Sequence, residues 1–376
     1  MKKEYLLSPG PTPVPPEALQ VMAEPMFHHR TPRFRKMFQD VTEGLQEVFC
    51  TKSDVITLFG SGTSAMEACV VNAVDAGEKA LVIRGGKFGE RWGDICEAYG
   101  IAFTAIDPEW GTAGTPEQVA EALKADPSIV AVFTTLVETS TGVLTDIQGM
   151  GEVVSKTDAL LVVDGISGVG AVECRVDAWH IDMLAVGSQK ALMIPPGLAY
   201  VSVSDKAWKK IEATKRGCFY LDLLKHRKAL GKWDPAFTPP VTLFAAQQKA
   251  LEIVRKEGIE NVWKRVKQLG AATRAAVEAM GLETYSQAPA DCLTTVKMPE
   301  GVDGDAVVKD MRDVQGVTPA GGQAHLKGKI IRLASMGYVN HFDIIIGLTA
   351  LAGALRKQNV KVDLGAAVDT FMKELG

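Results

Sequence analysis

Residues 159–165 read ALLVVDG, five apolar side chains followed by a carboxylate and a glycine. An unbroken apolar run of this length predicts a β-strand that is buried on both faces, as in a parallel sheet. Asp164 then stands at the carboxyl end of the strand, where open α/β sheets bind their ligands. An aspartate at this place is also a common helix cap or turn residue, so the stretch alone leaves both interpretations open.

Similar apolar runs lie on both sides of this stretch, with helical patterns between them. Strands are predicted at 55–58, 80–83, 101–104, 130–133, 159–163, 183–186 and 199–203. Short apolar runs that alternate with helices indicate βαβ units and a mostly parallel sheet covered on both faces. The predicted fold class is therefore α/β, with a mostly parallel seven-stranded sheet in a large domain.

The pattern changes on either side of this region. Prolines fix φ and remove donors, so the opening from Ser8 to Pro16 predicts an extended arm, and a helix is predicted over 32–49. A helical region is predicted from 243 to 280, followed by a small α+β unit with strands at 293–298, 316–319 and 330–334 and a helix over 343–357. Because 376 residues exceed one usual core, we expect an arm (1–20), a large domain (21–255) and a small C-terminal domain (256–376).

Composition excludes several classes of protein. The net charge is −4 without a basic run, so neither nucleic acid nor an anionic membrane is an expected partner. No segment reaches the ~18 apolar residues of a membrane span, and the start offers too short an apolar stretch for a signal peptide. The cysteines show no metal-ligand spacing, so no metal is expected and reduced thiols in the cytoplasm are predicted. They are Cys50, Cys69, Cys96, Cys174, Cys218 and Cys292.

A glycine-containing turn follows the first predicted strand of the sheet. Ser61, Gly62 and Thr63 precede a helix predicted over 65–74. Glycine lets the backbone approach a ligand, and the N–H groups at a helix N-terminus favour an anion such as phosphate. The spacing matches neither the dinucleotide fingerprint nor a Walker A motif, so an ordinary capped turn is an equal alternative.

Lys190 follows the strand at 183–186, with Gln189 before it and a Pro-Pro-Gly turn at 195–197 after it. Most lysines are solvated, but one held between apolar segments loses proton affinity and becomes an amine nucleophile for carbonyl chemistry. A phosphate loop, a strand-end aspartate and a buried lysine are together what pyridoxal phosphate requires. Lys190 would bond to the cofactor aldehyde, while Asp164 would keep the ring nitrogen protonated.

Matching motifs are spread over nearly the whole chain. They lie at 9–12 (PGPT), 61–63 (SGT), 86–92 (GKFGERW), 138–143 (ETSTGV), 163–164 (VD), 187–190 (GSQK) with 195–197 (PPG), and 331–333 (IRL). In this order they resemble the class V aminotransferases of PLP fold type I, in particular the alanine–glyoxylate and serine–pyruvate branch. The resemblance implies a transaminase with pyridoxal 5'-phosphate as cofactor, acting as a homodimer in amino-acid metabolism.

The resemblance also implies roles for single residues. Phe88 would stack on the pyridine ring, Ser140 would lie near the ring's phenolic oxygen and the substrate, and Gln189 would hold the phosphate together with Ser61, Gly62 and Thr63. Lys190 would carry the proton between the substrate Cα and the cofactor C4′. Arg332 would clamp the substrate α-carboxylate with its bidentate fork, beside Gly10 and Ser140. Without the family pattern, a core aromatic and a rim salt bridge are the ordinary interpretations of Phe88 and Arg332.

Thr238 would reach the phosphate of the neighbouring subunit. Some family members carry a tyrosine three positions earlier, whereas this chain has Pro235 there and Trp233 two residues before it. The sequence therefore leaves open whether either residue replaces the tyrosine contact.

Small substrates are expected: alanine or serine as amino donor and glyoxylate or pyruvate as acceptor. Arg332 supplies one carboxylate clamp, and a second buried anion without a cation would cost several kcal/mol. Aspartate or 2-aminoethylphosphonate is the alternative donor, with Arg30 as the candidate second cation, although a subunit-interface ion pair is the preferred interpretation of Arg30. The competing functions are cysteine desulfuration through Cys292, a non-enzymatic accessory role, and a dehydrogenase activity, which the missing dinucleotide fingerprint disfavours.

Overall fold

The computed structural model describes residues 3–215 and 217–376, and a seven-stranded sheet is its largest element. The strand order is β2-β10-β9-β8-β5-β3-β4. The strands are β2 (Asp54–Gly60), β3 (Lys79–Ile83), β4 (Ala102–Ile106), β5 (Ile129–Thr135), β8 (Leu160–Asp164), β9 (Met183–Gly187) and β10 (Gly197–Val203). All neighbours pair in parallel except β10, which runs antiparallel to β2 and to β9. The predicted fold class is confirmed.

The central strands direct the polar residues that follow them to one edge of the sheet. Every residue of β8 and β9 is buried, as the unbroken apolar runs predict. These two strands are parallel, with Asp164 paired to Ala185. Asp164 at the end of β8 and Lys190 after β9 therefore lie at the same edge, the carboxyl edge, which also receives the turn after β2.

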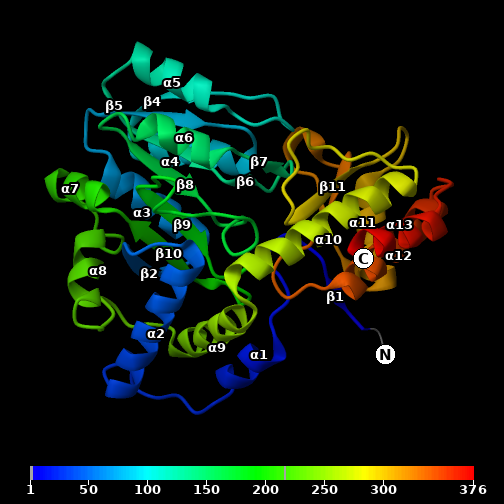
Figure 1. The fold of residues 1–376 in the computed structure, drawn as a ribbon, viewed down its shortest axis with the longest axis horizontal. Helices are drawn as coiled ribbons and strands as arrows, with labels where there is room; N and C mark the ends of the chain where they lie inside the picture. The colour runs from blue at the N-terminus through cyan, green and yellow to red at the C-terminus, as the bar shows by residue number, and fades with distance from the viewer. Residues whose placement is uncertain (1–2, 216) are drawn as a thin grey trace.

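Helices alternate with the strands and pack against the sheet (Figure 1). They are α2 (Pro32–Phe49), α3 (Gly62–Ala73), α4 (Lys87–Ala98), α5 (Pro116–Ala125), α6 (Ile147–Val154), α7 (Asp205–Ala213), α8 (Leu223–Leu230) and α9 (Val241–Glu257). A short hairpin of β6 (Val137–Glu138) and β7 (Val143–Leu144) follows β5. Helix α3 begins three residues earlier than predicted, so Gly62 and Thr63 belong to its first turn.

The C-terminal unit lies beside the sheet, and α10 (Ile259–Ala279) runs between the two parts (Figure 1). It contains the sheet β11 (Leu293–Lys297), β14 (Ile330–Ala334) and β13 (Ala320–Gly321). Around it are α11 (Gly304–Lys309), η1 (Asp310–Gln315), β12 (Val317–Thr318), η2 (Ala324–Leu326), α12 (His341–Lys357) and α13 (Leu364–Leu375). The helical region predicted over 243–280 is broken, because Gly258 takes a left-handed φ of 84° between α9 and α10.

The N-terminal arm connects the two parts. Strand β1 (Tyr5–Leu6) pairs in parallel with β12 of the C-terminal unit. The prediction that Pro16 is not helical is wrong, since α1 (Pro16–Met22) begins at this residue. Proline fits the first position of a helix because its missing N–H has no intrahelical acceptor there.

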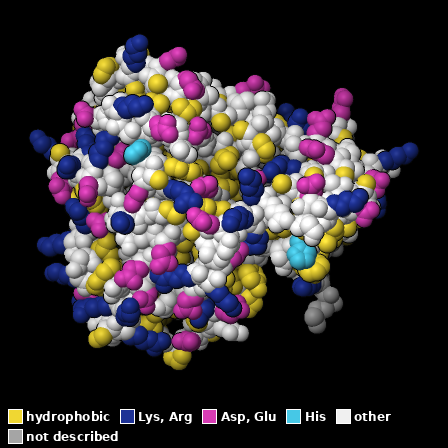
Figure 2. All heavy atoms as spheres, in the orientation of Figure 1, with side chains coloured by type: hydrophobic (Ala, Val, Ile, Leu, Met, Phe, Trp, Pro, Cys, Tyr) yellow, Lys and Arg dark blue, Asp and Glu magenta, His cyan; other side chains and the backbone are white. Residues whose placement is uncertain are grey.

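Hydrophobic side chains form two clusters, one around the seven-stranded sheet and one among α10, α12, α13 and the C-terminal strands. We retain the division near residue 255 as a proposal. On the face in Figure 2, acidic and basic side chains are interspersed, and hydrophobic atoms gather where the two parts meet. Within residues 3–215 and 217–376, no helix has the length and apolar character to cross a bilayer.

Candidate active site

Lys190 is buried in the loop after β9, with only 9% of its surface exposed. The N-terminal arm crosses directly over it: its Nζ donates a hydrogen bond to the carbonyl of Pro9 at 2.5 Å, and its own carbonyl accepts one from Thr12 Oγ1 at 2.7 Å. Gly10 packs on the lysine side chain so closely that a Cβ would collide with it. Burial lowers the pKa of Lys190 to about 8, with the charges of Arg332 and Arg91 acting in the same direction and Asp164 opposing them. A neutral amine is therefore accessible near neutral pH.

Asp164 is 3% exposed and lies close enough to Lys190 for their charges to interact. Its Oδ1 accepts a hydrogen bond from the N–H of Ile166 at 2.8 Å. Burial raises the pKa of Asp164 to about 7, and the carboxylate of Glu138 raises it further, against the opposing effects of that N–H group and of the nearby cations. A carboxylate in such surroundings favours a cationic N–H partner.

The first turn of α3 lies against the loop that carries Lys190. A Cβ on Gly187 would lie 3.0 Å from Oε1 of Gln189 and 3.4 Å from the Cα of Gly62. Ser61 precedes the helix as its N-cap without a side-chain cap hydrogen bond. Among the described residues, none donates a hydrogen bond to Oε1 of Gln189, although that atom is buried. The N-terminal N–H groups of α3 and a polar side chain thus converge on one small region.

Helix α4 contributes Phe88 and Arg91, which lie one turn apart. The guanidinium of Arg91 lies 5.0 Å from the centroid of the Phe88 ring, and its Nη1 donates to Thr63 Oγ1 at 3.2 Å. The sequence motif at 86–92 contains Arg91 but predicted no role for it. The spacing from Phe88 was an available signal, because residues i and i+3 share one face of a helix.

Arg332 enters this region from β14 of the C-terminal unit. It is buried, and its Nε and Nη2 donate to the carbonyl of Gly321 at 3.0 and 2.7 Å, while Nη1 donates to the carbonyl of Thr139 at 2.8 Å. Burial lowers the pKa of Arg332 to about 10, and Glu138 opposes this shift. The side chain stays cationic at neutral pH and keeps further N–H groups for a ligand, because a guanidinium has five.

Ser140 completes the cluster. It is fully buried, its hydroxyl donates to Glu138 Oε1 at 2.5 Å, and the N–H of Lys87 donates to the same hydroxyl at 3.0 Å. Thr139, whose carbonyl accepts from Arg332, directly precedes Ser140. Ser140 therefore lies between that guanidinium and the first turn of α4.

Thr238 and Arg30 are exposed, one after α8 and the other before α2. Trp233 packs edge-on against Phe38, with ring centroids 6.2 Å apart, and Pro235 is half-buried. Among the described residues, the hydrogen bonds of the Lys190 side chain go to Pro9 and not to any of these four.

Cys292 is buried near Lys190, and burial raises its pKa to about 12. A thiol in this state is a poor nucleophile, which disfavours cysteine desulfuration. In the part of the chain that the structure describes, His, Cys, Asp and Glu form no cluster suited to a metal ion.

Comparison with known proteins identifies the family of this chain. Residues 4–324 match the model of the aminotransferase class-V family. A protein named soluble hydrogenase, small subunit, from Synechococcus sp. is 40% identical over 94% of this chain and 93% of its own. Two relatives are 32% identical: the L-aspartate–glyoxylate aminotransferase of Paracoccus denitrificans, over 96% of this chain and 91% of its own, and the serine–glyoxylate aminotransferase of Methylorubrum extorquens, over 99% and 96%.

A solved structure agrees with these relatives. The alanine–glyoxylate aminotransferase of Nostoc sp. superposes with a TM-score of 0.91 at 31% identity, covering 95% of this chain and 96% of that protein. The resemblance predicted from the motifs is thereby confirmed. This chain belongs to the class-V aminotransferase family.

Proposed function

We propose that the chain transfers the amino group of a small, uncharged amino acid, such as alanine or serine, to a short 2-oxo acid, such as glyoxylate or pyruvate, with pyridoxal 5'-phosphate as cofactor. The observation that carries this proposal is the buried Lys190, with its pKa lowered to about 8, beside Asp164 and Arg332 at the carboxyl edge of the sheet. An amine nucleophile, a buried carboxylate and a carboxylate-binding guanidinium are the groups that transamination needs.

The residues fit this cofactor. The N-terminus of α3 and the side-chain NH2 group of Gln189 suit the phosphate, with Ser61, Gly62 and Thr63, because a phosphate accepts hydrogen bonds from such N–H groups. Phe88 offers its ring to the pyridine face, and Ser140 offers a hydroxyl. Asp164 offers its carboxylate to a protonated ring nitrogen. When bound, the cofactor supplies an electron sink for the electrons of the substrate Cα–H bond.

The side chains of this chain then divide the work of binding and proton transfer. Arg332 binds the α-carboxylate, since the carbonyls of Gly321 and Thr139 already fix its plane. Lys190 Nζ would accept the proton of the substrate Cα as a general base and would then release it as a general acid. The carbonyl of Pro9 orients that amine.

The proposed assembly is a homodimer in which Thr238 of one copy reaches the phosphate region of the other. Exposed apolar side chains near Thr238 and the start of α2 support it: Phe219 is 75% and Met26 68% exposed. Large exposed apolar groups of this kind are typical of subunit contacts. Sedimentation should show a dimer at low concentration, and a fully active monomer would refute it. The cysteines form no disulfide within the described residues, in keeping with a proposed reducing, cytoplasmic location.

The choice of donor rests on charge. The glyoxylate-linked relatives carry serine, alanine or aspartate in their names. In the described chain Arg30 is exposed, and Arg91 donates to Thr63 in the turn that suits the phosphate, so we assign neither cation to a second anion on the donor. We therefore favour a monocarboxylic donor.

The test compares kcat/KM for alanine and serine with that for aspartate and 2-aminoethylphosphonate, in the wild type and in Arg30→Ala. The small donors should win, and the substitution should leave the order unchanged. A dianionic donor that wins by more than about tenfold, an advantage lost in Arg30→Ala, would overturn the proposal.

A second candidate function is that of a non-enzymatic subunit, which the 40% identical relative named as a hydrogenase subunit favours. The conversion of bound cofactor by an added amino acid distinguishes the two. A protein that binds the cofactor but shows no absorbance change with any amino donor would support the accessory role.

A further inference from the structure

Glu138 is a buried carboxylate at the end of β6 whose hydrogen-bond partners come from two separate segments. Its Oε2 accepts from the N–H groups of Phe88 at 3.1 Å and Gly89 at 2.8 Å, in the first turn of α4. Its Oε1 accepts from the N–H of Ser140 at 3.0 Å and from the hydroxyl of Ser140 at 2.5 Å. The N–H of Phe88 also lies 3.3 Å from Oε1, so the carboxylate bridges the α4 turn and Ser140, with Gly89 on Oε2 alone and Ser140 on Oε1 alone.

The helix favours a carboxylate at this position. The first N–H groups of a helix have no intrahelical acceptors, and they carry the positive end of the helix dipole. Charge-assisted hydrogen bonds from such groups offset the desolvation of a buried carboxylate. A Cβ on Gly86 would lie 2.5 Å from the carboxyl carbon of Glu138 and from Ser140 Oγ, so the chain approaches here as closely as glycine permits.

Three consecutive residues, Glu138, Thr139 and Ser140, each contact a different residue or segment of the candidate site. The side chain of Glu138 holds α4, which carries Phe88 and Arg91. The carbonyl of Thr139 accepts from Arg332. The hydroxyl of Ser140 accepts from the N–H of Lys87.

We propose that Glu138 is a positioning residue, which fixes the orientation of Phe88 and Ser140 toward the cofactor and the position of Ser140 relative to Arg332. The proposal rests on the proposed function, and it concerns a residue for which the family motif alone predicted no role. Glu138 acts only through these neighbours.

The test variant is Glu138→Gln, which keeps the shape but replaces one acceptor oxygen with a donor NH2 group. Whichever way the amide turns, its NH2 group faces groups that donate, so either Gly89 or Ser140 loses its acceptor. In the holoenzyme we expect a weaker visible circular dichroism band of the bound cofactor, a roughly 10-fold higher cofactor Kd and a roughly 10-fold higher KM for the amino donor.

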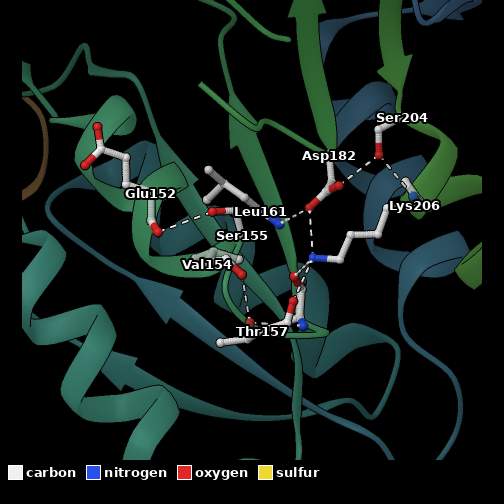
Figure 3. A network of polar contacts seen from close by, with 10 residues as sticks. Glu152, Val154, Ser155, Thr157, Leu161, Asp182, Ser204 and Lys206 are labelled. Atoms are coloured by element: carbon white, nitrogen blue, oxygen red, sulfur yellow. Dashed lines mark hydrogen bonds and ion pairs between the residues drawn. The ribbon is translucent and has the colours of Figure 1, made fainter. Parts of the chain in front are cut away.

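The matched control is Asp182→Asn. Asp182 is also a buried carboxylate that accepts from an N–H group and a hydroxyl, those of Leu161 at 3.0 Å and Ser204 at 2.8 Å (Figure 3). It directly precedes β9 and so lies at the amino edge of the sheet, opposite Lys190. The control should lower Tm without changing the circular dichroism band, Kd or KM. This comparison separates a loss of stability from a loss of orientation.

Two results would overturn the inference. One is a Glu138→Gln holoenzyme with a lowered Tm but with its dichroism, Kd and KM within about twofold of wild type, as in the control. The other is a lowered kcat with all three unchanged, since that would mean a direct role in the chemical step.

If Glu138→Gln does not fold, Gly86→Ala takes its place, because the added methyl disturbs the contact between the Glu138 carboxyl group and Ser140 without removing the charge. It should produce the same changes in dichroism, Kd and KM, and their absence would refute the proposal. A wild type that binds no pyridoxal phosphate would instead contradict the proposed function.

Discussion

Two groups of polar residues, each around a buried carboxylate, lie at opposite ends of the same strands, β8 and β9. At the amino ends, Asp182 accepts hydrogen bonds from Leu161 and Ser204, and Lys206 Nζ donates to the carbonyl of Ala159 at 2.5 Å and lies 3.6 Å from Asp182 Oδ2 (Figure 3). At the carboxyl ends, burial shifts the pKa of Asp164 to about 7 and that of Lys190 to about 8, each toward its neutral form.

The difference separates residues that stabilise the fold from residues kept for a ligand. At the amino ends, the hydrogen-bonding groups of Asp182 find partners within the protein, so this carboxylate stabilises the fold. At the carboxyl ends, hydrogen bonds and ion pairs do not fully offset the cost of burying Asp164 and Lys190. This destabilises the protein and is typical of functional sites. Substitutions at the carboxyl ends should therefore lower activity more than stability, and substitutions at the amino ends should lower stability more than activity.

The largest expected effect on activity is that of Lys190→Ala. Removing the amine should abolish transamination, because the variant has neither the group that carries the cofactor nor the group that moves the proton. The protein should stay folded, which circular dichroism in the far ultraviolet can check. Substantial remaining turnover would place the reactive amine elsewhere.

Asp164→Asn should retain the cofactor but lose several orders of magnitude in rate, since a neutral amide cannot hold the ring nitrogen protonated. A variant within about tenfold of wild type, a barrier change of only ~1.4 kcal/mol, would mean that Asp164 is a structural cap.

The same variant has a second, pH-dependent consequence in protein freed of cofactor. The pKa of Asp164 is raised on folding, so the folded state binds its proton more tightly and loses stability as pH rises from about 4 to about 7. Asp164→Asn should therefore be more stable than wild type at pH ~8, with the difference fading below pH ~4. Denaturant titrations at the two pH values measure this, and destabilisation at pH ~8 would contradict it.

Arg332→Lys should raise KM for the amino acid about 100-fold with a smaller change in kcat, because an ammonium cannot replace the planar fork that Gly321 and Thr139 orient. An amine donor without an α-carboxylate serves as the control and should be little affected. Equal losses for both donors would show that the substitution disturbs the site in general.

Asp182→Asn should have the smallest effect on activity, with kcat/KM within about twofold of wild type. Its free energy of unfolding should fall by about 1–3 kcal/mol, because Ser204 and Leu161 lose a charged acceptor. A large loss of activity without a loss of stability would remove the contrast between the two ends of the sheet.

Much of the fold is readable in the apolar runs. All seven strands of the main sheet were predicted, since strands buried on both faces leave unbroken hydrophobic stretches. The sequence pattern did not predict that α9 and α10 are separated at Gly258 or that α1 begins at Pro16, because both depend on the backbone geometry of one residue. Helical periodicity continues across such a break.

The site was only partly predictable. Lys190, Asp164 and Arg332 could be named from their motifs, and the structure brings them close together. The contact of Arg91 with Thr63 and the double role of Glu138 could not, since side chains from distant segments meet only after folding. The roles proposed for Thr238 and Arg30 depend on a neighbouring subunit, and the contacts within one chain do not define it.

The central claim is that Lys190 is the residue that carries the cofactor. Borohydride reduction of the holoenzyme, followed by digestion and mass spectrometry, tests it directly. We predict that the cofactor is fixed on the single peptide that contains Lys190. Attachment to any other lysine, such as Lys206 at the opposite edge of the sheet, or to no lysine at all, would contradict the account.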